Sequence, residues 1–144
     1  MKKNLLALLL IVGVVFSSCK KEDPVTPTDA RDKFVGTWNG TQTIVISGLG
    51  INSSDAVSET HAKSSTNANQ IIIDGSLIAN VNGNSYTYNQ FTETITDPTL
   101  GTVVFIFNGT GTINGTNIVE TGTVSTIVQG QSYNGTWSTN LVKQ

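Results

Sequence analysis

Hydrophobic and polar residues alternate with a period of two along most of the chain from residue 34 onward. Successive side chains of a β-strand point to opposite faces, so this alternation predicts strands with one buried face. Short runs of Gly, Asn, Ser and Pro interrupt it and are typical of turns. The segments predicted as strands are 36–47, 69–74, 76–81, 85–95, 102–113, 117–128 and 133–142. With the polar segment 57–65, whose pattern fits either a strand or a short helix, the chain has about eight strands.

Short turns should connect neighbouring strands as hairpins. The turn sequences are Asn82-Gly83, Asn114-Gly115 and Gln129-Gly130-Gln131. Asn-Gly favours a type I′ turn, in which both central residues need positive φ. A longer loop is expected at 47–50 and 52–54. These short connections indicate an antiparallel meander.

Two irregularities inside predicted strands indicate β-bulges. The alternation slips between Tyr88 and Phe91, and Asn108-Gly109 interrupts the strand predicted at 102–113. A bulge inserts one extra residue and shifts the side-chain phase in this way. Asp97-Pro98 should end the strand predicted at 85–95, because proline cannot donate to the hydrogen-bond ladder.

An antiparallel meander of eight strands can close into an up-and-down barrel, which leaves no strand edge exposed. We therefore expect an all-β domain closed as a barrel, with a two-sheet β-sandwich as the alternative. A barrel of this size is either filled by its own side chains or holds one small ligand. The sequence does not distinguish a filled interior from one that holds a ligand.

The first eighteen residues have the parts of a secretory signal peptide. Lys2 and Lys3 give a positive start, and residues 5–16 form a continuous apolar run. As a helix this run would be about 18 Å long, too short for a bilayer core of about 30 Å. Its length fits the apolar region of a signal peptide. Two small serines follow, and then Cys19, the only cysteine in the chain.

The sequence Val15-Phe16-Ser17-Ser18-Cys19 resembles the lipobox of bacterial lipoproteins, although Leu is commoner where Phe16 stands. In that family the cysteine receives a diacylglycerol and the peptide is cleaved just before it. The resemblance implies that residues 1–18 are removed and that Cys19 anchors the mature chain to a membrane. An ordinary signal peptide followed by an incidental cysteine is the alternative.

The residues after the cysteine, Lys20-Lys21-Glu22-Asp23, are similar to the start of Bacteroidota lipoproteins, where such a sequence resembles a surface-export signal. This resemblance implies a protein anchored in the bacterial outer membrane, on its periplasmic or its surface-exposed face. Pro24 and Pro27 favour a semi-extended spacer. We therefore expect residues 19–33 to form a flexible tether and residues 34–144 to form the folded domain.

Gly36-Thr37-Trp38, at the start of the first predicted strand, resembles the Gly-x-Trp signature of lipocalins, in which the tryptophan closes one end of the barrel. Segments 30–38 and 109–116 are similar to small lipocalin-like lipoproteins of the Bacteroidota. The resemblance implies a lipocalin-like barrel. Gly135-Thr136-Trp137 repeats the motif in the last strand. The first and last strands of a closed meander are neighbours, so we expect Trp38 and Trp137 to pack together. Unlike classical lipocalins, the chain from residue 34 onward has no arginine to cap the tryptophan.

The charge of the predicted domain excludes several functions. From residue 34 onward there are six acidic residues and only two basic ones, Lys63 and Lys143. Binding to a nucleic-acid backbone requires clustered Lys and Arg, so we exclude a nucleic-acid partner. A basic membrane-binding patch is excluded for the same reason.

No motif marks a catalytic, cofactor or metal site. His61 is the only histidine, and it shares one face of an extended segment with Glu59 and Lys63. We interpret this face as a solvated polar edge. The sequence contains neither the usual zinc-ligand spacings nor a calcium loop. We therefore expect no enzyme activity. The sequence does not exclude a pair of catalytic carboxylates that only the fold brings together.

Binding functions remain. A small apolar ligand inside the barrel would contact Trp38, Ile44, Phe105 and Trp137, unless these side chains simply fill the core. A glycan or protein partner would instead stack on Tyr86 and Tyr88 at the surface, unless the two tyrosines are ordinary cross-strand packing. A purely structural envelope role is the third alternative. The sequence thus predicts a lipid-anchored, non-catalytic envelope protein.

Overall fold

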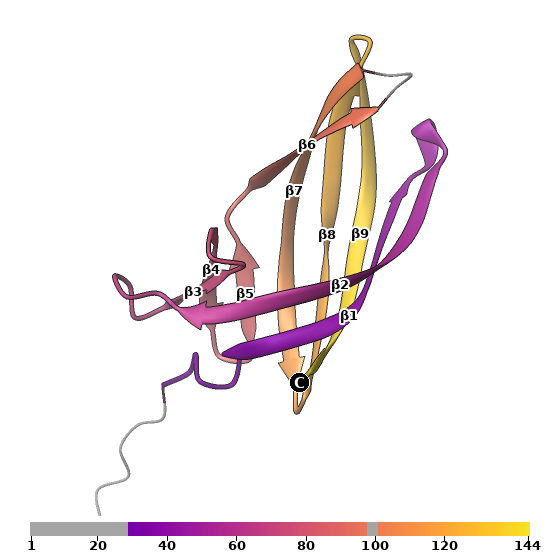
Figure 1. Cartoon of the computed structure of the whole chain (residues 1–144). Helices are drawn as coiled ribbons and strands as arrows, with labels where there is room; N and C mark the ends of the chain where they lie inside the picture. Colours follow the sequence, from indigo (N-terminus) through magenta and orange to yellow (C-terminus); the bar gives the residue numbers. More distant parts are fainter. Residues whose placement is uncertain (1–28, 98–100) are drawn as a thin grey trace, which may run out of the picture.

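The computed structural model describes residues 29–97 and 101–144, which form an all-β domain (Figure 1). The predicted signal peptide, Cys19 and residues 20–28 of the predicted tether lie outside the described residues. Within the described ranges, no helix has the length and hydrophobicity needed to cross a membrane.

Nine strands make up the domain. They are β1 (Gly36–Ile46), β2 (Ile51–Lys63), β3 (Gln70–Ile73), β4 (Leu77–Asn82), β5 (Ser85–Tyr88), β6 (Phe91–Asp97), β7 (Gly101–Asn114), β8 (Asn117–Val128) and β9 (Gln131–Lys143). A single 3-10 turn, η2 (Ser47–Leu49), connects β1 to β2. The uncertain segment 57–65 is therefore mostly strand, and residues 52–54 belong to β2 and not to a loop.

The strands form one antiparallel sheet in the order β5-β4-β3-β2-β1-β9-β8-β7-β6. β5 also pairs with β7, for example Tyr86 opposite Gly111, so hydrogen bonds run in a ring through eight strands. The expected all-β, barrel-like meander is confirmed. The ninth strand, β6, pairs with β7 from outside this ring and tilts away from the other strands (Figure 1).

Two predicted bulges are wrong. The slip between Tyr88 and Phe91 is a complete break, at which the chain leaves the ring between β5 and β6. Pairing between β7 and β8 continues without interruption through Asn108 and Gly109. The glycine at this position serves a different purpose, because a Cβ on Gly109 would lie 2.4 Å from Cζ2 of Trp137. The glycine lets this large ring lie against the sheet.

The predicted hairpins are confirmed, with a small shift in two of them. β4 ends at Asn82 and β7 at Asn114, so the loop residues begin at Gly83 and Gly115. Both glycines have positive φ, of 57° and 61°. The expected positive φ at the preceding asparagines is not present. Positive φ at two successive residues occurs instead at Gln129 and Gly130, after β8, and at Asp74 and Gly75, between β3 and β4.

Trp38 closes one end of the interior. Its side chain is fully buried, and its indole Nε1 donates a 2.7 Å hydrogen bond to the carbonyl oxygen of Phe34. The Lys143 ammonium lies 5.3 Å from the centre of the indole ring, within the range of a cation–π interaction. This end is therefore filled with side chains.

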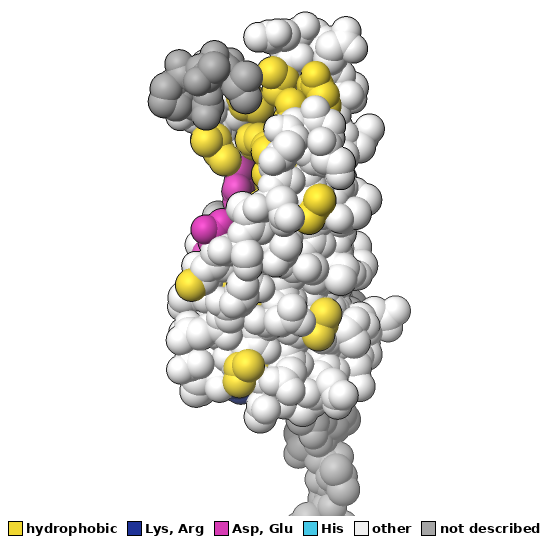
Figure 2. Space-filling model, turned by 90° about the vertical axis from the view of Figure 1, so that its right-hand side faces the viewer, with side chains coloured by type: hydrophobic (Ala, Val, Ile, Leu, Met, Phe, Trp, Pro, Cys, Tyr) yellow, Lys and Arg dark blue, Asp and Glu magenta, His cyan; other side chains and the backbone are white. Residues whose placement is uncertain are grey.

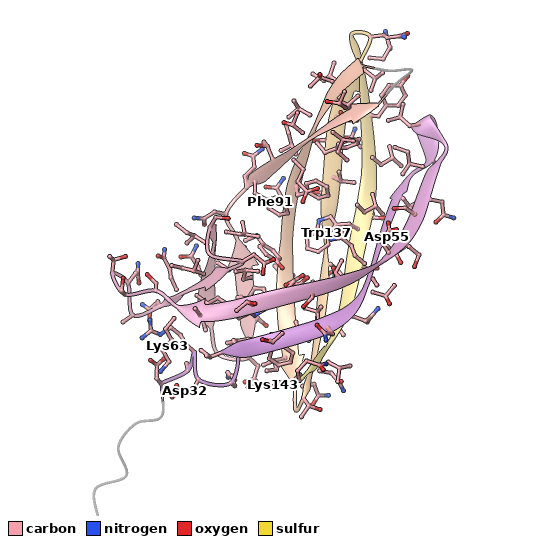
Figure 3. The ribbon with its side chains drawn as sticks, viewed as in Figure 1. Asp32, Asp55, Lys63, Phe91, Trp137 and Lys143 are labelled. Carbon is pink, nitrogen blue, oxygen red and sulfur yellow. The ribbon has the colours of Figure 1, made fainter. Side chains whose placement is uncertain are left out.

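Residues 29–33, which we predicted as part of the tether, belong to the folded domain. The Arg31 guanidinium binds Asp29 and also donates to the carbonyl oxygens of Ser64 and Asn67, at 3.1 and 3.0 Å. Lys63 forms ion pairs with Asp29 and Asp32 at the same place (Figure 3). The predicted tether was too long because these local charges are paired and not simply solvated. Hydrogen bonds from Arg31 also hold the pKa of Asp29 well below its usual value.

Candidate functional site

Three titratable side chains meet inside the ring of strands. Glu59 and His61 come from β2, two residues apart and therefore on the same face of the strand. Glu120 comes from β8, which is not a neighbour of β2 in the sheet. One ligand-type atom from each of the three side chains lies within 4.8 Å of the other two. The cluster thus spans the interior and exists only because the sheet closes.

The three side chains are strongly desolvated. His61 has no exposed side-chain surface, Glu59 is 13% exposed, and Glu120 is fully buried. The Nε2 atom of His61 lies 3.0 Å from Oε2 of Glu59. The imidazole also packs against the rings of Trp38 and Tyr86, with centroids 5.9 and 5.8 Å away. The histidine is therefore held in a fixed orientation.

Two tyrosines from β5 bind the buried carboxylate. The hydroxyls of Tyr86 and Tyr88 both donate hydrogen bonds to Oε1 of Glu120, that of Tyr86 over 2.5 Å. Burial and the nearby Glu120 carboxylate raise the pKa of both phenols far above the usual value, so both stay protonated donors. Gly111 makes this possible, because a Cβ there would lie 2.2 Å from Cζ of Tyr86.

The second oxygen of Glu120 is left without a partner among the described residues. Oε2 of Glu120, Nδ1 of His61 and Oγ1 of Thr139, which lies directly opposite Glu120 in the ladder, are buried and make no hydrogen bond with the described part of the chain. Burial raises the pKa of Glu120 to about 7, and repulsion from Glu59 adds to this shift. Buried polar atoms are rarely left unpaired in proteins, so this region is suited to a ligand.

A pocket of about 260 Å³ connects the cluster to the surface. Its lining includes four carboxylates, Glu59, Asp74, Glu93 and Glu120, and none of the described residues that line it is basic. Asp74 and Glu93 are exposed, so the acidic lining extends from the surface to the buried Glu120. Figure 2 shows acidic side chains gathered in a hollow at one edge of the molecule.

Aromatic side chains complete the pocket. Phe91 from β6 and Trp137 from β9 are part of its lining, together with Tyr88 (Figure 3). The ring of Tyr88 lies 5.8 Å from that of Phe91 and 5.6 Å from that of Trp137. β6 reaches the pocket only because the chain leaves the ring after β5. The pocket therefore combines an acidic interior with an aromatic wall.

The four residues predicted to line the interior do so. Trp38 and Trp137 are buried, and Ile44 and Phe105 are partly buried against the same core. Trp38 and Trp137 do not pack together, however. β1 and β9 are neighbours, but their register places Trp137 opposite Ile44, six residues from Trp38 along β1. That offset is about 20 Å in a strand.

Two other predictions are wrong. Tyr86 and Tyr88 do not form a surface stacking pair, since they are 1% and 7% exposed and point inward. Glu59 and His61 are not a solvated polar edge, because their face of β2 points into the ring. Lys63, which has the same phase, lies outside the cluster, near the end of the strand, and pairs with Asp29 and Asp32.

Glu120 was not recognised as a site residue from the sequence. Its neighbours Ile118 and Val124 are hydrophobic, and all three have the same phase along β8. An acidic residue on the buried face of a strand is the one signal that could have identified it.

No protein-family model matches this chain, and no curated protein has significant sequence similarity to it.

Proposed function

We propose that this protein is a lipid-anchored envelope protein that binds a small positively charged ligand in the acidic pocket of its β-domain. The observation that carries this proposal is the lining of the pocket. Four carboxylates from different parts of the chain surround it, the innermost is fully buried, and no described lining residue is basic.

The electrostatics of the pocket favour a cation. Like charges that share a partly enclosed, low-dielectric space create a strong negative potential and attract counter-ions. A purely apolar ligand would leave the carboxylates of Glu59 and Glu120 desolvated without compensation, which costs free energy. The aromatic wall, formed by Phe91, Trp137 and Tyr88, is compatible with a cation because the face of an aromatic ring is electronegative.

The proposal retains the lipid anchor at Cys19 and the outer-membrane location that the sequence predicts. A surface glycan as ligand is less well supported, since Tyr86 and Tyr88 are buried. We propose binding and not catalysis for this pocket.

A ligand panel tests the proposal. The mature chain, purified in a non-ionic detergent, would be incubated with Zn²⁺, Ca²⁺, putrescine, succinate or glucose, and binding followed by thermal shift and tryptophan fluorescence. We expect a response to at least one cation and to neither of the last two compounds. Glu120→Gln should abolish the response. Asp55→Asn, which removes a charge from β2 outside the pocket, should retain it. Equal responses to cations, succinate and glucose would contradict the proposal.

A further inference from the structure

The geometry of the buried cluster narrows the identity of the cation. We propose that Glu59, His61 and Glu120 bind a divalent transition-metal ion such as Zn²⁺. This inference rests on the proposed function and specifies its ligand. The three donor atoms lie within 4.8 Å of one another inside the domain, a spacing at which all three can contact a single ion.

The donor set is that of a transition metal. Imidazole nitrogen is a good ligand for Zn²⁺, Cu²⁺, Fe²⁺ and Ni²⁺, whereas Mg²⁺ and Ca²⁺ prefer oxygen ligands alone. Three protein ligands around Zn²⁺ leave a fourth position for water or another small molecule. The pocket reaches Glu59 and Glu120, so that fourth position would face the pocket.

The surrounding hydrogen bonds prepare Glu120 to act as a ligand. Tyr86 and Tyr88 both bind Oε1, which fixes the carboxylate and leaves Oε2 without a partner among the described residues. Such outer hydrogen bonds are typical of metal sites, where they orient the ligands. Nδ1 of His61 is likewise unpartnered within the described ranges, so one ring nitrogen is available in addition to the one beside Glu59.

Binding requires a modest contraction of the cluster. Ligand atoms around a tetrahedral Zn²⁺ are about 3.3 Å apart, given bonds of about 2.0–2.1 Å. Oε2 of Glu59 and Nε2 of His61 are already 3.0 Å apart. The remaining closure, at most about 1.5 Å given the 4.8 Å limit, involves the Glu120 carboxylate, which small rotations about its side-chain bonds can move.

The direct test is a titration of Zn²⁺ into the mature chain after removal of metals with EDTA, followed by calorimetry and native mass spectrometry. We expect one ion per chain, with an affinity at least tenfold higher than for Mg²⁺ or Ca²⁺. Co²⁺ provides a second readout, because its visible absorption bands depend on the geometry and the ligands of the site.

Isosteric variants identify the ligands. Glu59→Gln, His61→Gln and Glu120→Gln should each weaken Zn²⁺ binding at least tenfold, and His61→Gln should change the Co²⁺ spectrum. Tyr88→Phe should weaken binding by about 10- to 100-fold, the usual effect of removing an outer hydrogen bond. Asp55→Asn is the matched control and should bind as the wild type does. Circular dichroism in EDTA would verify that each variant is folded.

Failure of this inference can be separated from failure of the proposed function. Zn²⁺ binding that is equally strong in wild type and in folded His61→Gln and Glu120→Gln variants would overturn the metal site. If putrescine but not Zn²⁺ bound in a Glu120-dependent manner, the metal site would be overturned while cation binding stood. If neither bound, both would be overturned.

Discussion

At the scale of single residues, the buried Glu120 carboxylate is the feature with the largest consequences. Its neighbours are Glu59 and His61 from β2 and Tyr86 and Tyr88 from β5, with Thr139 opposite in the ladder. None of the described groups that contact it is a lysine or an arginine. The charged form of Glu120 is therefore poorly stabilised, and the domain retains it at a cost in stability.

This cost predicts the dependence of stability on pH. Folding raises the pKa of Glu120 from 4.5 to about 7, so between these values the folded state binds a proton that the unfolded state does not. The free energy of unfolding is therefore highest below about pH 4.5. It falls by about 3 kcal/mol as the pH rises through about 7. Urea unfolding of the metal-free mature chain at pH 5 and pH 8 measures it.

Glu120→Gln should remove most of this dependence, because the amide does not titrate. The variant should be more stable than wild type at pH 8 in EDTA. Asp55→Asn should keep the wild-type slope. A Glu120→Gln variant with an unchanged slope would show that other groups cause it.

Gly111 is a second residue with a specific role, because its lack of a side chain makes room for the ring of Tyr86. A Cβ there would lie 2.2 Å from Cζ of Tyr86 and 2.6 Å from the phenol oxygen. We expect Gly111→Ala to destabilise the domain by about 1–3 kcal/mol, the usual cost of overpacking. Urea unfolding provides the measurement. In a Tyr86→Ala background the same substitution should cost much less, and an equal cost in both backgrounds would argue against this contact.

At the scale of elements, the sequence pattern located strands well where one face is buried. β3, β4, β8 and β9 were predicted within a few residues because their alternation is regular and their turns contain Gly. The break between β5 and β6 was read as a bulge, since a slip of phase looks the same in both cases. What distinguishes them is the pairing of β5 with β7, a contact between distant segments that no local pattern encodes.

The candidate site, like the break between β5 and β6, depends on contacts between distant segments that the local sequence pattern does not predict. Period-two alternation places Glu59 and His61 on one face, but it does not say that this face is inward. Glu120 lies 59 residues further along the chain than His61. The three residues meet only when β2 and β8 lie on opposite sides of a closed ring. The sequence therefore places two members of the cluster on one face, and it marks the third only as an acidic residue among the hydrophobic positions of a strand.

Arg31 connects the N-terminal segment to the loop between β2 and β3. Its guanidinium donates to the carbonyl oxygens of Ser64 and Asn67, and its side chain is only 12% exposed. We expect Arg31→Ala to destabilise the domain and to increase hydrogen exchange in residues 64–70. Lys33→Ala is the control, because Lys33 contacts Asn84 and the ring of Phe34 but not the loop between β2 and β3. Unchanged exchange in Arg31→Ala would show that the loop is stable without this contact.

At the scale of the whole molecule, the ring of eight strands leaves two different ends. Trp38 and Phe34 fill one end, and the last residue, Gln144, is held there by a hydrogen bond to Thr37. Residues 29–33 also lie near this end (Figure 1). The acidic pocket opens between β6 and the turn from β3 to β4.

The anchor itself is the last prediction. Two acyl chains are needed for stable attachment, since each buried methylene contributes only about 0.8 kcal/mol. Cys19→Ala should therefore prevent acylation and release the protein from membranes, as shown by metabolic labelling with a fatty acid and by fractionation. Ser18→Ala keeps a small residue before the cysteine and should remain labelled. Label on the Cys19→Ala chain would refute the lipoprotein assignment. A wild-type chain that is secreted without label would instead favour an ordinary signal peptide, and the pocket would then belong to a freely diffusing protein.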